Sequence, residues 1–427
     1  MSTQTVHTTA DIILPQTRRL WEHAHQVLIG GGQAHRRPAK YVARNCPAFA
    51  THGKGAYFWD VDGRRYLDYL CGYGPIILGH ADEEVNAAVI EQLSRGTIFS
   101  LEHPEVLSFV EELCQQIPCA QLGTLLVGGS STTLAAVRCA RAYTRRELVV
   151  RCGYHGWFDW AMPNDVGSPP SQAHLTLEIP FNDVQKLEEV FARQGDKIAV
   201  LILEGVNEVT PSPEFVAATR RVCDRSGAVL ILDEVKTGFR VHPGGAQALY
   251  GYQPDLATFG KAMGNGFAIS ALLGRREILQ KTADVFIGAT FHGELLGIAA
   301  ARATRRAMQQ RDGYGHIRRM GQRLMAGLDK VFEQTGYPAM LVGDATMPML
   351  LRTPAGHARP VPPAWHEYVL TEWCAAMQRR GFFMTGHVWF LTASHTPADI
   401  DATVAAGGDA ALEAMDILHR ASRAGVA

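Results

Sequence analysis

The chain has 427 residues, 47% of them hydrophobic, so it can bury a large core and is expected to contain about two or three domains. Its 41 basic and 42 acidic residues nearly balance and form no long block of one sign, which disfavours nucleic acid or an anionic membrane as a partner. The eight cysteines include no CxxC pair and there is no HExxH motif, so neither a disulfide framework nor a metal site is predicted.

The N-terminal part of the chain predicts a helix followed by an antiparallel hairpin. Its first residues lack the basic start and apolar core of a signal peptide, and no apolar run reaches the roughly 18 residues of a membrane span, so a cytoplasmic protein is expected. Residues 10–29 have helical periodicity, and residues 55–70, GAYFWDVDGRRYLDYL, contain the turn signal DVDG between two strand-like runs.

The middle of the chain has a different pattern. From about residue 85 to residue 310, short apolar runs alternate with helical periodicity, which is typical of a parallel sheet covered by helices on both faces. A helix over 314–336, short strands and a final helix then predict a smaller α+β domain. The expected division is an N-terminal segment packing with the small domain, a large α/β domain and the small domain itself, over residues 1–75, 76–315 and 316–427.

Three strands of the predicted sheet end in charged residues. KIAVLILEG ends in Glu204, GAVLILDEV contains Asp233, and DLATFGK ends in Lys261. The spacings, 29 residues from Glu204 to Asp233 and 28 from Asp233 to Lys261, fit one βα unit each. A single charge at a strand end is commonly just the point where the chain meets water. Three of them at the edge where open α/β sheets bind ligands predict a functional site.

A glycine- and hydroxyl-rich loop precedes these strands. In GTLLVGGSSTTLAAVRCARAY, an apolar strand leads through residues 128–132 into a helix. Unpaired N–H groups and hydroxyls at a helix N-terminus can bind a phosphate. The loop matches neither GxxxxGK[ST] nor GxGxxG, which disfavours a nucleotide. The alternative is that these hydroxyls only cap the helix.

These parts together suit pyridoxal phosphate (PLP). A lysine can form a Schiff base with its aldehyde, a carboxylate can keep its pyridine nitrogen protonated, and the loop can anchor its phosphate. An aromatic residue and a histidine follow in the motif CGYHGW. Burial at the tip of an apolar strand lowers the pKa of an amine, which would make Lys261 both a nucleophile and a proton shuttle.

At these motifs the sequence resembles a known family, the class III (fold type I) PLP-dependent aminotransferases, and within it the glutamate-1-semialdehyde aminomutase-like branch. The resemblance runs from GAYFWDVDGRRYLDYLCGYGPIILGH through YHGW, LILDEVKTGFR and FGKAMGNG to ATFHGELLGIAAARAT. It implies an α/β fold with a mostly parallel, seven-stranded sheet between helices, and a smaller α+β domain built from the N- and C-terminal segments. It also implies a homodimer with shared active sites.

The resemblance further implies which residues bind the cofactor. Lys261 would form the Schiff base and Asp233 would contact the pyridine nitrogen. The contacts to the two ring faces and to the phosphate would come from Val235, Tyr154, Gly129, Ser130 and Ser131. Thr290 matches a threonine that, in the family, completes the phosphate site of the neighbouring subunit.

The substrate contacts are predicted from fewer signals. Arg37 matches an arginine that binds a substrate carboxylate, although a solvated loop charge is the alternative. Further candidates for the pocket are Tyr73, Glu204 and His292, together with His387 and Trp389, for which core positions are more common. The sequence departs from the usual family pattern at Ser131, Gly205 and His292.

The predicted activity is transfer of an amino group between an amino-acid-like donor and a carbonyl acceptor. The same residues would also serve an intramolecular aminomutase of the glutamate-1-semialdehyde type, or an amino-acid racemase or epimerase. A non-enzymatic phosphate-binding protein is the alternative of a different class, but it leaves Lys261 and Asp233 unexplained.

Overall fold

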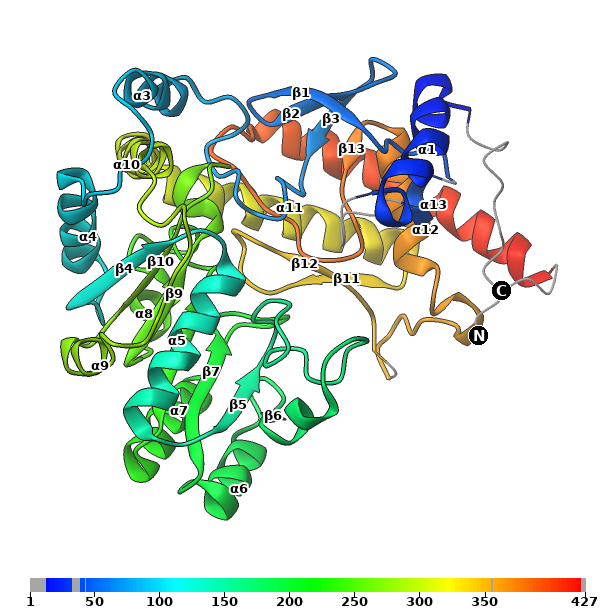
Figure 1. Ribbon diagram of the computed structural model, residues 1–427. Helices are drawn as coiled ribbons and strands as arrows, with labels where there is room; N and C mark the ends of the chain where they lie inside the picture. The colour runs from blue at the N-terminus through cyan, green and yellow to red at the C-terminus, as the bar shows by residue number, and fades with distance from the viewer. Residues whose placement is uncertain (1–12, 33–38, 43, 355, 424–427) are drawn as a thin grey trace. The chain divides into compact units, whose positions relative to one another are not determined.

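The computed structural model describes residues 13–32, 39–42, 44–354 and 356–423 (Figure 1). The chain divides into two compact units. We call Met1–Tyr73, Leu78–Asp82 and Gly315–Ala427 the small unit, and Gly74–Ile77 and Glu83–Tyr314 the large unit. Within the described ranges, no helix is both long enough and apolar enough to cross a membrane.

The large unit is built around a seven-stranded sheet. In spatial order its strands are β4 (Leu122–Leu126), β10 (Ser270–Gly274), β9 (Leu256–Phe259), β8 (Val229–Glu234), β7 (Ile198–Glu204), β5 (Leu148–Cys152) and β6 (Thr176–Glu178). Only β10 runs antiparallel to its neighbours β4 and β9. The predicted α/β fold with a mostly parallel sheet is therefore confirmed.

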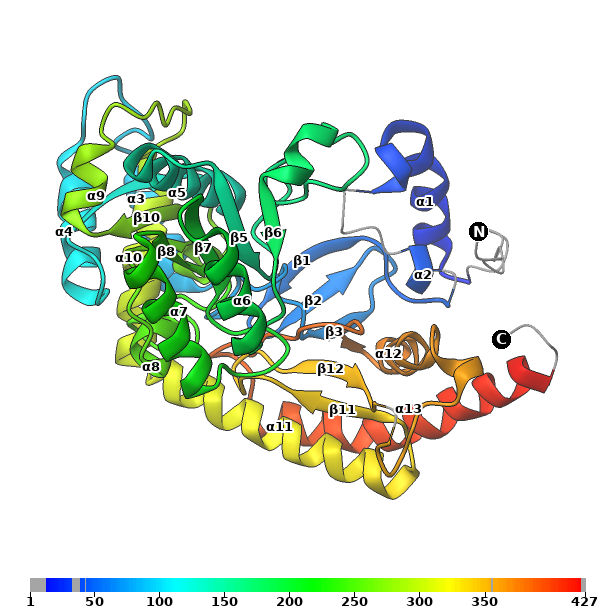
Figure 2. The same cartoon turned by 90° about the horizontal axis from the view of Figure 1, so that it is seen from below.

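The central strands need cover on both faces because every residue of β7 and β8 is buried. Helix α5 (Gly129–Thr144) lies on one face, and α6 (Val184–Gln194), α7 (Pro213–Ser226) and α8 (Gly245–Tyr250) lie on the other (Figure 2). The remaining helices of this unit are α3 (Glu83–Leu93), α4 (Pro104–Gln116), α9 (Arg276–Lys281) and α10 (Leu295–Gln310).

The crossover helix α7 has a clear start and stop in the sequence. The Ser212 side chain accepts a hydrogen bond from the Phe215 N–H at 3.1 Å, with a proline at the first helical position. The helix ends at Gly227, which has a φ of +72°. These signals fix the length of the connection, so β7 and β8 end at the same edge of the sheet.

The small unit has a four-stranded sheet in the order β1 (Ala50–Lys54), β2 (Tyr57–Asp60), β3 (Arg65–Asp68) and β13 (Phe382–Phe383). Strands β2 and β3 pair antiparallel, as the DVDG signal predicts. Asp60 stabilises their turn because its Oδ1 accepts hydrogen bonds from the N–H groups of Asp62 and Arg64. Strand β13 pairs with β3 in parallel, so N- and C-terminal segments share this sheet.

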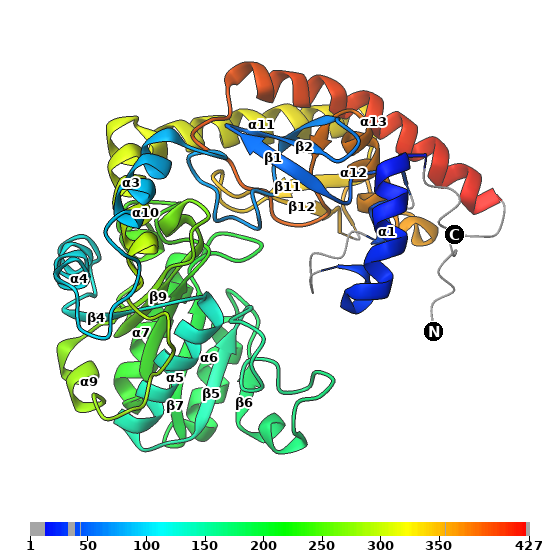
Figure 3. The ribbon, with the colours of Figure 1, turned by 45° about the horizontal axis from the view of Figure 1, so that its top comes forward.

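The other elements of the small unit are α1 (Pro15–Val27), α2 (Ala39–Val42), α11 (Gly313–Thr335), β11 (Ala339–Val342), β12 (Met349–Arg352), α12 (Val369–Arg379) and α13 (Pro397–Arg423). The long helices α11 and α13 run side by side (Figure 3). Glycines allow this approach: a Cβ at Gly327 would meet Val404, and one at Gly407 would lie 2.7 Å from Leu328. An ion pair between Arg323 and Asp401 also joins the two helices.

A buried histidine, His395, packs into the core of the small unit just before helix α13. His395 is 0% exposed, and its ring stacks on Tyr69 with centroids 4.9 Å apart. Its Nδ1 accepts the Thr392 N–H at 3.0 Å, so the neutral ring fits this position. Nε2 is buried without a hydrogen-bond partner among the residues that the structure describes. Burial lowers the pKa of His395 to about 4, although Asp399 and Asp68 oppose the shift.

This histidine predicts acid sensitivity of the fold. Its contribution to stability is complete above the unfolded pKa of about 6.5 and is lost as the pH falls towards 4, which amounts to about 3 kcal/mol. His395→Asn keeps an acceptor for the Thr392 N–H but does not titrate. Urea unfolding between pH 7 and pH 4 should therefore show a shallower loss of stability for the variant. Identical pH dependence of both proteins would contradict the assignment.

Candidate active site

The charged strand ends lie side by side in the sheet. Glu204 at the end of β7 is paired in register with Asp233 of β8, and Asp233 is paired with Thr258 of β9. Lys261 follows β9 after one residue, Gly260, at the start of a short 3-10 helix, Lys261–Gly264. The edge that the sequence predicts as a ligand site therefore carries two carboxylates and one amine.

Asp233 is a buried carboxylate with several donors. Its side chain accepts hydrogen bonds from His155 Nδ1 at 2.8 Å, from Thr258 Oγ1 at 3.1 Å and from the Val235 N–H at 3.1 Å. Burial alone would raise the pKa of Asp233, but the hydrogen bond and charge of His155 outweigh it, with help from Val235 and Lys261. The pKa lies below its ordinary value, so the carboxylate stays charged.

His155 is held on both sides. Its Nε2 lies 3.2 Å from the Cys152 carbonyl oxygen, while Nδ1 faces Asp233. Both ring nitrogens therefore face oxygen atoms, one at the end of β5 and one on β8, and the imidazole is not exposed to solvent. The ring fixes the position of the Asp233 side chain as well as its charge.

Lys261 has an unusual backbone and an unpartnered side chain. Its φ is +40°, in the left-handed region that costs a non-glycine residue about 1 kcal/mol. No hydrogen bond or ion pair joins its amine to any residue that the structure describes. Burial and the charge of Lys236 lower its pKa, against the charges of Asp233 and Glu204. A larger share of neutral, nucleophilic amine results.

The glycine-rich loop lies against the same strand edge. Helix α5 begins at Gly129 with no side-chain cap, after Gly128 with a φ of +93°. A Cβ at Gly129 would lie 2.7 Å from Cγ1 of Val235, and one at Gly156 would lie 2.5 Å from Oγ of Ser130. Close packing thus brings the uncapped N–H groups of α5 next to β8 and to the YHGW motif.

Tyr154 places an aromatic ring beside these groups. Its backbone N–H donates to Glu204 Oε2 at 3.3 Å, which ties the loop after β5 to the end of β7. The side chain is 52% exposed, so the ring is available to a ligand. Partial burial and the charge of Asp233 raise the pKa of its hydroxyl, which keeps the ring neutral.

The remaining predicted residues lie in other segments of the described chain or, for Arg37, outside it. Thr290 and His292 lie in a turn of the large unit, and Thr290 is exposed. No hydrogen bond or ion pair in the described chain joins either side chain to Lys261 or Asp233. Tyr73 belongs to the small unit, and Arg37 lies outside the described residues. In the small unit, Trp389 is buried and stacks on Trp373, so it is a core residue, whereas His387 is exposed.

Sequence reasoning missed two partners of the cluster. The link from His155 to Asp233 spans 78 residues, and only the motif YHGW hinted at it. The ion pair between Lys236 Nζ and Glu204 Oε1, at 2.7 Å, was also not predicted. The sequence hinted at this pair only through charged residues at the ends of two neighbouring strands.

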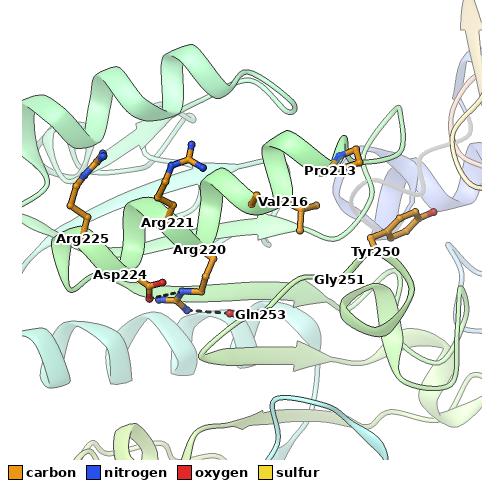
Figure 4. A pocket seen from close by; sticks show the side chains of 10 residues that line it. Pro213, Val216, Arg220, Arg221, Asp224, Arg225, Tyr250, Gly251 and Gln253 are labelled. Carbon is orange, nitrogen blue, oxygen red and sulfur yellow. Dashed lines mark hydrogen bonds and ion pairs between the residues drawn. The ribbon is translucent and has the colours of Figure 1, made fainter.

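A separate surface hollow lies between α7 and the loop after α8 (Figure 4). It contains three arginines, but each has acidic partners: Arg220 pairs with Asp224, and both Arg221 and Arg225 pair with Glu188. It is lined by no nucleophile with a lowered pKa. The hollow therefore lacks the chemistry found at the strand edge.

A comparison with protein families shows which family this chain belongs to. The model of class-III aminotransferases matches residues 40–347, which is most of the chain. The chain belongs to the class-III aminotransferase family. Its cofactor is PLP, and its reaction is transfer of an amino group to a carbonyl acceptor. The resemblance inferred from the motifs is thereby confirmed.

Individual relatives cover nearly the whole of this aminotransferase. It is 35% identical to 3-aminobutyryl-CoA aminotransferase of Cloacimonas acidaminovorans, over 95% of this chain and 99% of the relative. It is 34% identical to glutamate-1-semialdehyde 2,1-aminomutase of Laribacter hongkongensis, over 93% and 99%. A solved structure, the PLP internal aldimine form of the FumI protein of Sphingopyxis sp. MTA144, is similar with a TM-score of 0.85, 27% identity and coverage of 96% and 97%.

The residues of this aminotransferase fit PLP. An uncapped helix start suits the phosphate, the buried and charged Asp233 suits a protonated ring nitrogen, and an unpartnered amine suits the aldehyde. Val235 and Tyr154 lie close to these groups and offer an aliphatic and an aromatic surface for a flat ring. The described residues contain no group of three or more side chains suited to a metal ion.

The geometry of Asp233 predicts its effect on rate. Asp233→Asn keeps the shape but removes the negative charge that His155 and the backbone support, so turnover should fall at least about 100-fold, or about 3 kcal/mol of barrier. Thr258→Val is the matched control, because it removes one hydrogen bond and leaves the charge. It should cost only a few-fold. Steady-state kinetics of both variants measure this, and a near-normal rate of the Asn variant would mean that another group faces the ring nitrogen.

Proposed function

We propose that this aminotransferase moves an amino group from an amino-acid-like donor to the carbonyl of a separate acceptor, with Lys261 as the residue that bonds the cofactor and moves the proton. The observation that carries this proposal is the Lys261 amine, which follows the strand next to Asp233, has a lowered pKa and has no hydrogen-bond or ion-pair partner among the described residues. PLP supplies an aldehyde that takes up the amino group and a ring that withdraws electrons.

The chain's own residues have separate tasks in this proposal. Asp233 faces the ring nitrogen and keeps a proton there, because His155 holds its carboxylate in the charged form. Val235 packs against one ring face and Tyr154 against the other. The phosphate is bound at the start of α5, by Gly129, Ser130 and Ser131. These contacts leave Lys261 free to move.

Lys261 is proposed to carry the proton from the donor carbon to the cofactor carbon. A base that does this must be neutral when it takes the proton and must have a pKa near the working pH. Burial and the neighbouring charge of Lys236 both lower the pKa of Lys261, which favours the neutral amine. Its φ of +40° fixes where the side chain leaves the backbone.

The substrate pocket is proposed to include Arg37, Tyr73, Glu204 and His292. Arg37 would bind a carboxylate with its guanidinium. Tyr73 is the third of four consecutive residues with positive φ, of 50°, 65°, 70° and 100° for Cys71, Gly72, Tyr73 and Gly74. Two non-glycine residues in this region store about 1 kcal/mol each, which supports a specific placement of the Tyr73 ring. Burial lowers the pKa of His292, so it would act as a neutral wall.

An aminomutase is the second candidate, because the similarity to glutamate-1-semialdehyde 2,1-aminomutases is nearly as strong as that to an aminotransferase. An aminomutase returns the amino group to the same molecule. It therefore releases no separate carbonyl product when it is given a simple amino donor in excess. This difference allows a direct test.

The proposed half-reaction can be followed spectroscopically. Amino donors added to the cofactor-loaded enzyme should convert the visible band of PLP and release the matching carbonyl product in stoichiometric amount. Lys261→Ala should reduce turnover by at least about a thousandfold, since nucleophile and proton shuttle are both lost. Borohydride should label Lys261 in the wild type. Conversion by no donor would favour the aminomutase, and labelling of Lys236 instead would refute the role of Lys261.

We also propose that the active unit is a homodimer. Large apolar side chains are exposed on the large unit, on α3, α4 and the segments that contact them: Ile90, Leu93, Ile98, Phe99, Leu101, Leu107 and Phe291. Two contacts bring these segments together: the Leu295 N–H donates to the Thr97 carbonyl at 2.8 Å, and a Cβ at Gly293 would lie 3.3 Å from Val106. An exposed apolar surface of this kind favours a second copy of the chain.

Thr290 precedes Phe291 in this surface, and its side chain is exposed. This position supports the inference that Thr290 binds the phosphate of the neighbouring subunit. Thr290→Val should then raise the dissociation constant of PLP about tenfold and leave the substrate preference unchanged, whereas Thr290→Ser should behave as the wild type. Equilibrium binding of PLP and sedimentation of the loaded and apo forms measure this. A fully active monomer would contradict the shared site.

A further inference from the structure

We propose that Lys236 and Glu204 form a charge-positioning pair for Lys261, in which Glu204 fixes the Lys236 ammonium at the strand edge from which Lys261 extends. The inference rests on the proposed role of Lys261 and adds two positioning residues to it.

The ends of strands β8 and β9 bring Lys236 near Lys261. Asp233 is paired with Thr258 and Glu234 with Phe259, and the pairing ends there. Just beyond it the two segments stay in contact, because a Cβ at Gly260 would lie 3.6 Å from Cγ1 of Val235. Lys236 directly follows Val235, and Lys261 directly follows Gly260. The two lysines therefore lie just past the ends of neighbouring strands.

Glu204 holds the Lys236 side chain in place. The Lys236 ammonium lies 2.7 Å from Oε1 of Glu204, and the two side chains are only 16% and 10% exposed. The other carboxylate oxygen, Oε2, accepts hydrogen bonds from Asn207 Nδ2 at 2.7 Å and from the Tyr154 N–H at 3.3 Å. Both oxygens of Glu204 are thus used, and the carboxylate is fixed from three directions.

The local backbone is built around this carboxylate. Gly153, with a φ of +103°, leaves the space into which Glu204 projects, because a Cβ there would collide with Oε2. A side chain in this left-handed conformation would be strained and would also displace the carboxylate. The pair is therefore part of the loop that carries Tyr154, and not a surface contact between two mobile side chains.

The charges that act on Lys261 come from all the neighbouring elements. Lys236 and Arg240 are positive, and Asp233 and Glu204 are negative. Arg240 is buried and donates to the Gly74 carbonyl oxygen at 2.9 Å, and Asp233 is bound to His155. Further titratable side chains at this edge are Tyr154, Cys152 and His155; burial raises the pKa of Tyr154 and that of Cys152, which keeps both neutral. Lys236 and Glu204 are therefore the adjacent opposite charges that can be removed separately.

A fixed cation beside an amine disfavours a second positive charge, and a fixed anion favours it. Because Lys236 and Glu204 act on Lys261 with opposite sign, each partner's effect is hidden while the pair is intact. Removing one partner leaves the other charge unopposed in a mostly buried site. A pair that only tied β7 to β8 would not have effects of opposite sign on the protonation of a third residue.

The test uses the resting, cofactor-loaded enzyme without substrate. The pH midpoint at which its visible absorption band changes is measured for the wild type, Lys236→Met, Glu204→Gln and the double variant. Lys236→Met should raise the midpoint by about one pH unit, and Glu204→Gln should lower it by about one pH unit. The double variant should return close to the wild type. Lys236→Arg, which keeps the charge, should change it least among the single variants.

Shifts of the same sign, or no shift in variants of normal thermal stability, would overturn the proposal and leave the pair a structural tie. If Lys236→Met does not fold, Glu204→Gln and Lys236→Arg alone still decide the sign. Borohydride labelling of the wild type separates the two claims. Label on Lys261 with unmoved midpoints refutes the charge-positioning pair only, whereas label on another lysine refutes the proposed role of Lys261 itself.

Discussion

Parallel strands of one sheet end at the same edge, and the chemistry of this enzyme depends on that constraint. The crossover helix α7 returns the chain in the direction of β7, so Glu204 and Asp233 emerge side by side, and β9 brings Lys261 next to them. No single strand could supply a carboxylate, an amine and an anion-binding helix start at one level. The sheet does so because its central strands are apolar until their last residues, which lets them be buried on both faces.

Neighbouring residues at this edge have different tasks because side chains alternate across a strand. Asp233 points to the site and is bound by His155. Glu234 points to the opposite face, where it accepts hydrogen bonds from Thr237 Oγ1 and from the N–H groups of Ala246 and Gln247 at the start of α8. Gly245, with a φ of +76°, gives Glu234 the room to do so. One acidic residue thus faces the proposed cofactor site while the next anchors the turn that follows it.

Electrostatics at the site combine burial with fixed partners. Burial alone would favour the neutral forms of both Asp233 and Lys261. The pKa of each is lowered, which favours the charged carboxylate of Asp233 but the neutral amine of Lys261. Asp233 keeps its charge because His155, Thr258 and the Val235 N–H all donate to it, whereas Lys261 has no hydrogen-bond partner in the described chain and its pKa is lowered by burial. A charged carboxylate beside a readily deprotonated amine is the arrangement that PLP chemistry needs.

The sequence by itself determined the parallel sheet, the family, and Lys261 and Asp233 as the leading candidates. These follow from local signals: apolar runs of strand length, caps of the connecting helices, and charges where strands end. The tertiary structure decided which side chains meet. His155 reaches Asp233 across 78 residues, and Lys236 pairs with Glu204 of the neighbouring strand segment. Such contacts depend on strand register and on the direction in which each loop leaves the sheet, and periodicity along one chain specifies neither, because it describes each element without its neighbours.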